Sequence, residues 1–389
     1  MNARLALTAP KNDNAKALYF LTNNDENTVA AVELGHNGLI TGKGKVWKTG
    51  GKGGAGVEGP SQPAGPDALF SQSAITVVDG HIFVVNAGSN SVSMFAIDHK
   101  DPLTLVLVGK PLDLPGEFPT TVAASKKHQL VCVGLTGKKA GIACARFSAK
   151  TGLGKVDTWR DIQLGQTTPP LGPTNTISQV FFSGDESQLL TTVKGDPPSK
   201  KDGFFSAYAV GGNGSAGSES LSQRDVRSTP NGTAVLFGSA VIPGSTDVFV
   251  TDASFGAAVL SVDARSEKAS IRAMVQVADQ KATCWATISL ATQTAFVTDV
   301  GKDRLLEIGY HPGGIKIITT ISLPSPKDGS LGLVDLRAAG NFVYILSPGR
   351  DGVEASIFIV HAPSRKLVQT AGIKSIGAGK NAMGMGLLV

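Results

Sequence analysis

Short apolar segments alternate with polar turns along the whole chain, and one unit of this pattern recurs. Thr294-Ala-Phe-Val-Thr-Asp has a near copy at Asp247-Val-Phe-Val-Thr-Asp, 47 residues upstream. Apolar and β-branched runs of about six residues, bounded by Gly, Asn or Asp, are typical of β-strands. The same opening occurs seven times, 47 to 63 residues apart, beginning at Leu18, His81, Gln129, Gln188, Asp247, Thr294 and Asn341.

A second apolar segment precedes six of the seven openings and ends in a turn, at residues 74–80, 121–127, 180–186, 240–246, 286–292 and 334–340. Self-similarity at this period indicates a ring of repeated sheets. We therefore predict an all-β fold, a single seven-bladed β-propeller domain spanning residues 1–389, with four-stranded antiparallel blades. We expect the chain termini to close the first blade, because residues 5–8 and 384–389 can both form strands.

Three insertions rich in Gly, Pro or Lys interrupt the minimal blade, at residues 42–67, 165–174 and 196–203. Such segments are commonly solvated loops. In the predicted blade order, however, all three project from the same end of the ring. Whether they cover the channel stays open at this point.

Net charge and cysteine content exclude some classes of function. The net charge of +5 is modest for 389 residues, and its lysines are dispersed, so we expect no nucleic-acid binding. No apolar run is long enough to predict a membrane span, and the first residues do not read as a signal peptide. Two glycosylation sequons, at Asn213 and Asn231, leave a secretory route open, with the cytoplasm as the alternative.

The three cysteines have no metal-ligand spacing. Cys132 and Cys144 fall on neighbouring predicted strands and could pair. We expect two buried thiols, which is the simpler alternative. We expect no metal site and no cofactor.

The register of the blades sorts the ionisable residues between the two ends of the ring. Connections between blades, and between the second and third strands, share the end where propellers bind ligands. All six histidines fall at the opposite end: His36, His81, His99, His128, His311 and His361. No imidazole is then available at the channel mouth as a base or metal ligand.

The register also predicts which residues ring the channel. Counting nine positions back from each opening gives Gln72, Thr120, Gln179, Gly238, Trp285 and Gly332. Amides within strands need hydrogen-bond partners, which either channel water or a ligand would supply. We expect Gln72, Gln179, Trp285 and Thr120 to contact a ligand.

Loops above this ring supply further candidates. Lys194 follows an apolar strand, so its neighbours would hold the ammonium at the rim, and Phe255 adds apolar surface. The other candidates from these loops are Asn86, Asp252 and Arg350. The mouth is therefore predicted to be amphipathic and suited to a small hydrophobic substrate with a few oxygen atoms.

Four segments, at residues 175–197, 227–238, 251–258 and 284–289, resemble the fungal proteins called 3-carboxymuconate cyclase-like, in the lactonase propeller superfamily. The resemblance implies a seven-bladed propeller and a fungal source, and it includes Asn175 among the candidate binding residues. Carboxymuconate-lactonising members use a channel histidine, which this chain lacks. Related members resemble hetero-Diels–Alderases of tropolone sesquiterpenoid pathways.

Three functions follow from these patterns. The first is a cyclase of fungal secondary metabolism that joins an o-quinone methide to a humulene-type alkene. Lys194, Gln72 and Gln179 would donate to the dienone oxygen, and Asp252 would assist the loss of water that forms the quinone methide. The second is a lactonase or lactonising enzyme with a carboxylate base. The third is a non-enzymatic secreted adhesin or binding propeller.

Overall fold

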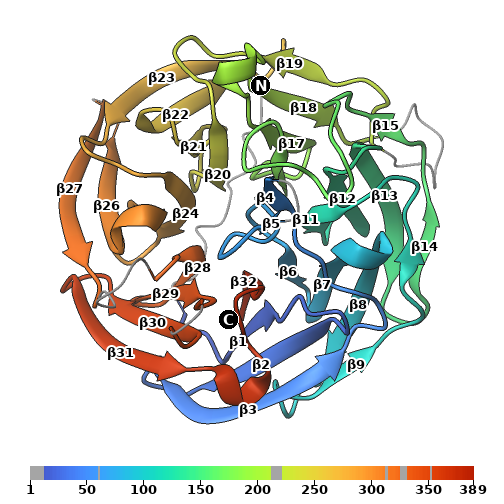
Figure 1. Cartoon of the computed structure of the whole chain (residues 1–389), viewed down its shortest axis with the longest axis vertical. Coiled ribbons are helices and arrows are strands. Elements are labelled where there is room, and N and C mark those ends of the chain that lie inside the picture. The colour runs from blue at the N-terminus through green and yellow to red at the C-terminus, as the bar shows by residue number, and fades with distance from the viewer. Residues whose placement is uncertain (1–12, 60–61, 212–220, 312–313, 325–330, 351–352) are drawn as a thin grey trace, which may run out of the picture.

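Seven antiparallel sheets stand around a central axis, as the ring in Figure 1 shows. This computed structural model describes residues 13–59, 62–211, 221–311, 314–324, 331–350 and 353–389. Each sheet has four strand positions from the axis outward. In two blades, a pair of short strands shares the outermost position. The predicted seven-bladed, all-β architecture is confirmed.

The first three blades are built from the C-terminal strand and the first half of the chain. Blade 1 consists of β32 (Met383–Leu388), β1 (Ala17–Leu21), β2 (Thr28–Leu34) and β3 (Ile40–Lys48). Blade 2 consists of β6 (Ile75–Val78), β7 (His81–Asn86), β8 (Ser91–Ile97), β9 (Leu105–Leu107) and β10 (Leu112–Asp113). Blade 3 consists of β11 (Pro119–Ser125), β12 (Leu130–Leu135), β13 (Gly141–Ser148), β14 (Gly152–Val156) and β15 (Arg160–Asp161).

The remaining blades follow in chain order. Blade 4 consists of β16 (Ile177–Phe182), β17 (Gln188–Val193), β18 (Phe204–Ala209) and β19 (Val226–Ser228). Blade 5 consists of β20 (Leu236–Val241), β21 (Val248–Asp252), β22 (Gly256–Val262) and β23 (Ala269–Gln276). Blade 6 consists of β24 (Thr283–Ser289), β25 (Thr294–Asp299), β26 (Arg304–His311) and β27 (Gly314–Ser322). Blade 7 consists of β28 (Val334–Ala339), β29 (Phe342–Ser347), β30 (Ser356–His361) and β31 (Lys366–Gly372).

Short elements lie outside the blades. They are the hairpin strands β4 (Val57–Gly59) and β5 (Gln62–Pro63), and the single-turn 3₁₀ helices η1 (Ala87–Ser89), η2 (Pro197–Ser199), η3 (Val300–Lys302) and η4 (Lys374–Ile376). No described helix is long and apolar enough to span a membrane.

The C-terminal strand closes the ring. β32 occupies the innermost position of blade 1 and pairs antiparallel with β1, with Leu18 opposite Leu387. This pairing confirms that a terminus completes the first blade, and it identifies the C-terminal one as the innermost strand. Residues 5–8, the other candidate for this closure, lie outside the described residues.

Side-chain burial decreases from the middle of each blade to its outer strand, as the pattern of apolar and polar residues in these strands predicts. The second-position strand β25 is buried along its whole length, because neighbouring blades cover both of its faces. The outer strand β23 alternates between buried or partly buried and exposed residues, as expected for a strand with one face in water. The repeated segments are therefore apolar runs rather than alternating strands because they occupy the middle of each blade.

The repeated Thr-Asp ending of β21 and β25 has a structural role in each blade. The Asp252 carboxylate is 0% exposed and accepts hydrogen bonds from the backbone amides of Ala234 and Val235. Asp299 does the same for Lys281 and Ala282 in the next blade. Both carboxylates thus satisfy buried amides in the connection that enters their own blade.

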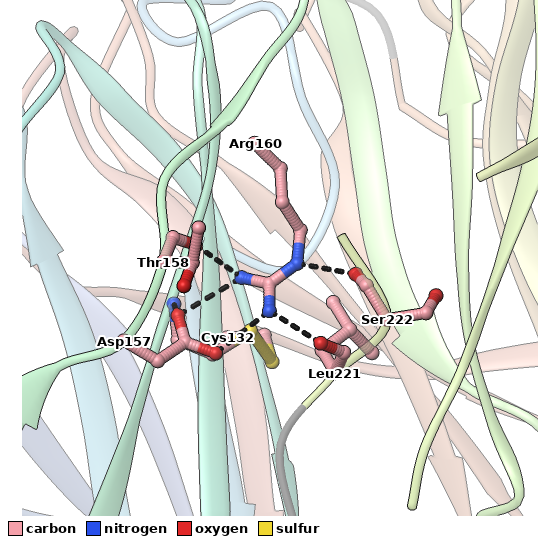
Figure 2. The surroundings of a disulfide bond; sticks show 7 residues. Cys132, Asp157, Thr158, Arg160, Leu221 and Ser222 are labelled. Atoms are coloured by element: carbon pink, nitrogen blue, oxygen red, sulfur yellow. Dashed lines mark hydrogen bonds and ion pairs between the residues drawn. A yellow bond between two sulfur atoms is a disulfide. The ribbon is translucent and has the colours of Figure 1, made fainter. Parts of the chain in front are cut away.

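A disulfide joins Cys132 on β12 to Cys144 on β13, so the expectation of two buried thiols was wrong. The two residues lie directly opposite each other in the strand pairing, with their Cα atoms 4.1 Å apart, which brings the sulfur atoms within bonding reach. Figure 2 shows the neighbouring Arg160, which donates to Asp157 and to the backbone oxygens of Thr158, Leu221 and Ser222. These bonds tie the rim of blade 3 to the chain that enters β19.

The first insertion is shorter than the sequence suggested. Residues 42–48 form the end of β3, the outer strand of blade 1, and do not belong to a loop. The strand was hidden because its glycines and lysines are the residues expected of a solvated loop, although here they face water from the blade edge. The insertion proper begins at Thr49.

Candidate active site

Residues 67–73, which we call the channel segment, cross the centre of the ring. The segment bonds to the innermost strands of four blades. Its bonds include Ser71 Oγ to the Thr120 oxygen at 2.7 Å in blade 3 and the Gln72 amide to the Ser178 oxygen at 2.8 Å in blade 4. On the other side, Trp285 of blade 6 donates to the Ser71 oxygen at 3.0 Å, and Asp335 of blade 7 accepts from the Ser73 amide at 3.2 Å. The channel of this propeller is therefore occupied by its own chain.

The backbone of the segment is bent to fit the channel. Phe70 and Ser73 have φ values of 54° and 67°, in the left-handed region that non-glycine residues seldom adopt. Asp67 stabilises the first bend, because its Oδ1 accepts a hydrogen bond from the Phe70 amide at 2.9 Å. Strained backbone that the surrounding contacts hold in place is common at functional sites.

The residues predicted to ring the channel do meet there, around the channel segment. The Gln72 side chain forms two hydrogen bonds with the Ala286 backbone, at 2.9 and 3.0 Å. Gln179 accepts from the Ser239 amide at 2.7 Å and donates to Ser73 Oγ at 3.3 Å. Trp285 is 0% exposed. These polar groups have internal partners, and their contact with a ligand stays a prediction.

The two glycines of the predicted ring have a packing reason. A Cβ on Gly238 would lie 2.5 Å from Gln72 Oε1, and one on Gly332 would lie 2.1 Å from Pro66 Cγ. Both distances are too short for a real Cβ contact. Glycine therefore stands in β20, and just before β28, where the channel segment and the residue before it come closest.

Lys194 is the buried cation of the channel. It follows β17 and is only 2% exposed, and its Nζ donates to the Phe70 oxygen at 2.6 Å. The ammonium lies 4.3 Å from the centre of the Phe237 ring and 6.0 Å from that of Phe70. No described carboxylate lies within ion-pair distance of it. Burial among these rings lowers the pKa of Lys194 to about 8, although the charge of Asp67 opposes the shift.

Asp67 is the acidic partner of this cation. Burial raises the pKa of the Asp67 carboxyl to about 7, while the Lys194 charge and the hydrogen bond from the Phe70 amide oppose the shift. The two groups thus interact through space, and both titrate near neutral pH. Sequence reasoning missed Asp67, because it closes a Gly- and Pro-rich insertion that has no strand periodicity. The thiol of Cys284 is a third buried group within electrostatic range of the pair, and burial raises its pKa.

The three insertions meet above the channel segment. The Val57 amide donates to the Pro170 oxygen at 2.9 Å, which joins the first insertion to the second. Thr174 Oγ1 donates to Asp196 Oδ1 at 3.0 Å, which joins the second to the third. We call the described residues of 49–66, 165–174 and 196–203 the lid. Figure 1 shows the β4–β5 hairpin of the lid near the centre of the ring.

The lid presses directly on the channel segment. A Cβ on Gly56 would lie 2.2 Å from the Phe70 ring, and one on Gly172 would lie 2.4 Å from it. Glycine at these two positions lets the lid backbone pack against the ring. Phe70 therefore connects the lid above with Lys194.

Most of the other candidate residues make structural contacts. Asn86 is buried and bonds to Asn27, Thr49, Ser91 and Ser93. Thr120 Oγ1 lies 3.3 Å from Thr136 Oγ1, and Asn175 donates to the Leu164 oxygen at 3.0 Å, which joins the two ends of the second insertion. Phe255 is partly buried against the core beside blade 5. Arg350 lies elsewhere, in a surface pocket of about 430 Å³ that Pro348 and Glu354 also line.

All six histidines lie at the end of the ring opposite the lid, as predicted. His36 and His99 follow β2 and β8, and His311 and His361 end β26 and β30. His81 opens β7, and His128 lies in the turn between β11 and β12. Within the described residues, no group of three or more His, Cys, Asp or Glu side chains could hold a metal ion.

Solved structures similar to this chain include several lactonases. The periplasmic gluconolactonase PpgL of Pseudomonas aeruginosa matches with a TM-score of 0.63 and 14% identity, over 96% of this chain and 99% of its own. A putative 6-phosphogluconolactonase from Bacteroides uniformis matches with a TM-score of 0.57 and 14% identity, over 74% and 80%. A functionally unknown protein from Desulfotomaculum acetoxidans matches with a TM-score of 0.63 and 9% identity, over 96% and 99%.

These similarities show a shared fold. The chain has the seven-bladed propeller architecture found in gluconolactonases. No protein-family model matches the sequence, and no curated protein matches it. An activity has to be argued from the residues of the channel.

Proposed function

We propose that this protein is a cofactor-independent cyclase whose acid–base pair is Lys194 and Asp67. The observation that carries the proposal is the buried Lys194 ammonium, which aromatic rings surround and no described carboxylate pairs with directly. A charge in that position is costly for folding. A desolvated ionisable pair with pKa values shifted toward neutrality, in a channel beneath a lid, is a common sign of a catalytic site.

The Phe70 oxygen marks where a substrate oxygen would bind. Lys194 donates to this carbonyl at 2.6 Å in the closed channel. When the lid and the channel segment move aside, a carbonyl oxygen of the substrate would take the same place. A desolvated ammonium there stabilises negative charge that develops on oxygen during the reaction.

The aromatic surroundings favour a hydrophobic substrate. Phe70 and Phe237 flank the ammonium, and Trp285 packs edge-on against Phe237 with the ring centres 4.8 Å apart. In the finer proposal, an o-quinone methide supplies the four-atom C=C–C=O unit and a humulene-type alkene supplies two carbons. Their cycloaddition forms one C–O and one C–C bond and releases no group. Holding two apolar partners together provides much of the rate increase.

Lactone hydrolysis or formation is the second candidate. The gluconolactonase PpgL shares this fold over 96% of the chain, which favours this chemistry. Lys194 would then polarise the lactone carbonyl, and Asp67, with its raised pKa, would exchange a proton with the attacking or leaving oxygen. A sugar lactone, however, fits the aromatic surroundings of Lys194 less well than an apolar substrate does.

The test compares wild-type protein with Lys194→Met and Lys138→Met. Lys138 lies in the connection between β12 and β13, at the same end of the ring, and is exposed. Each protein is incubated with a tropolone quinone-methide precursor plus a humulene alcohol, and separately with muconate and sugar lactones. Loss of Lys194 should lower the catalysed rate about 100-fold or more, while the control keeps it.

The substrates distinguish the candidates. Faster or stereoselective adduct formation supports the cyclase, whereas lactone turnover that depends on Asp67 and Lys194 supports the second candidate. If wild-type protein accelerates neither reaction, the enzyme proposals fail and the binding propeller remains. If Lys194→Met retains full activity, the assignment of Lys194 is wrong.

A further inference from the structure

The sequon Asn231-Gly-Thr lies in an exposed turn at the lid end of the ring. It belongs to the connection between β19 and β20, which leads from blade 4 to blade 5. Asn231 and Gly232 are exposed, and no hydrogen bond from the Asn231 side chain to a described residue is present. Thr233 Oγ1 and the Thr233 amide both bond to the Pro230 oxygen, at 2.7 and 3.1 Å. The turn therefore holds its own shape and leaves the asparagine amide accessible.

The disulfide provides an independent observation about the compartment. Cys132 and Cys144 are 0% and 1% exposed, in the middle of blade 3. Disulfides of this kind form and persist in the secretory pathway and outside the cell, and they are rare where cytosolic thiols keep cysteines reduced. One such oxidising compartment is the lumen of the endoplasmic reticulum, where sequons are modified.

We propose that Asn231 carries an N-linked glycan. The sequon supplies the required residues, the exposed turn leaves room for a bulky sugar, and the disulfide indicates passage through an oxidising lumen. The glycan would stand beside the lid. The Gly195 amide donates to the Ala234 oxygen at 2.9 Å, and Thr229 Oγ1 donates to the Gly203 oxygen at 3.3 Å. These bonds attach both sides of the turn to the two ends of the third insertion.

The test uses the full chain with an added cleavable secretion signal, expressed in yeast and translated into microsomes. An Asn213→Gln background removes the other sequon. We expect one endoglycosidase-sensitive species in this background, which Asn231→Gln and Thr233→Ala abolish. Thr233→Ser should keep the glycan because it preserves a sequon hydroxyl. Peptide mass mapping after enzymatic deglycosylation should find aspartate at position 231.

The microsome assay does not depend on a variant's stability, because the sugar is attached as the chain enters the lumen. Protease protection identifies the lumenal chains. Unmodified Asn231 in protected chains would overturn the proposal. A glycosylated species that persists in Asn231→Gln would overturn it as well, since another residue would then be the acceptor.

Discussion

Replacing Lys194 with methionine should change how stability depends on pH. Folding lowers the pKa of Lys194 from its ordinary value of 10.5 to about 8, because the side chain is buried. Below pH 8 the lysine is charged in both the folded and the unfolded chain, so the folded state bears the full cost of burying the charge. Above pH 8 the folded state loses its proton first, and this cost is progressively removed. The Lys194 contribution therefore makes the wild-type protein more stable as pH rises from 8 toward 10.5.

The size of the effect follows from the same pKa values. Between pH 7 and pH 10, the unfolded chain binds more protons at Lys194 than the folded chain does. Summed over this pH range, the difference raises the unfolding free energy of the wild-type protein by roughly 2 to 3 kcal/mol. Lys194→Met has no such proton, and methionine fills a similar volume. Its stability relative to wild type should therefore fall by roughly 2 to 3 kcal/mol from pH 7 to pH 10.

The double difference is the change in unfolding free energy from pH 7 to pH 10 in the variant minus the same change in wild type. Urea unfolding at the two pH values, followed by tryptophan fluorescence, measures it. Groups that titrate identically in both proteins cancel in it. Asp67 does not cancel in this comparison, because loss of the Lys194 charge lets the pKa of Asp67 rise further in the variant. A carboxyl with a raised folded-state pKa loses stability as pH rises through that pKa, so Asp67 adds to the expected fall for Lys194→Met. Lys138→Met, at an exposed position, should show a difference close to zero. A double difference below about 1 kcal/mol for Lys194→Met would refute the claim that the folded state holds a desolvated ammonium.

Two further substitutions test the channel segment and the lid. Gln72→Leu leaves a buried amide and a carbonyl of blade 6 without partners, so it should destabilise the protein by about 2 to 5 kcal/mol in urea unfolding. Gln163→Leu, at an exposed position, should change the unfolding free energy little. Equal losses of stability in the two variants would contradict the claim that the Gln72 side chain stabilises the backbone of blade 6. Gly172→Ala places a methyl group 2.4 Å from an aromatic ring and should lower the melting temperature, whereas Gly59→Ala, with no atom closer than 3.7 Å, should not. Unchanged melting of Gly172→Ala would show that the lid does not pack as described.

The sequence predicts the ring well because its signal is local and repeated. Each opening, such as the one at Thr294, carries an apolar run and a turn, and the constant order of strands assigns every residue to one end of the ring. That order placed the histidines correctly. Lys194 was also found by a local signal, since a lysine directly after an apolar strand must be held near its neighbours.

The channel contacts could not be predicted in the same way. Gln72 bonds to Ala286, 214 positions later in the chain, and no local pattern encodes that pairing. The register placed Gln72, Gln179 and Trp285 at the channel, but it did not show that residues 67–73, which include Gln72, cross the channel and bond to the other two residues. Asp67 was missed for the same reason. The repeated Thr-Asp ending was visible, but only the structure shows that these carboxylates bond to backbone amides.

The channel segment also affects how the molecule assembles. In most repeat proteins each unit contacts only its neighbours, so units can form and separate almost independently. Residues 67–73 are synthesised before blades 3, 4, 6 and 7, to which they bond, and blade 1 waits for β32, which follows all the other strands. Completion of the ring is thus tied to β32, which is made after the strands of all the other blades. A chain arrested before residue 383 would lack the closing strand and the hydrogen bond that the Met385 amide donates to Asp335 at the centre. Folding and unfolding should therefore be cooperative across all seven blades.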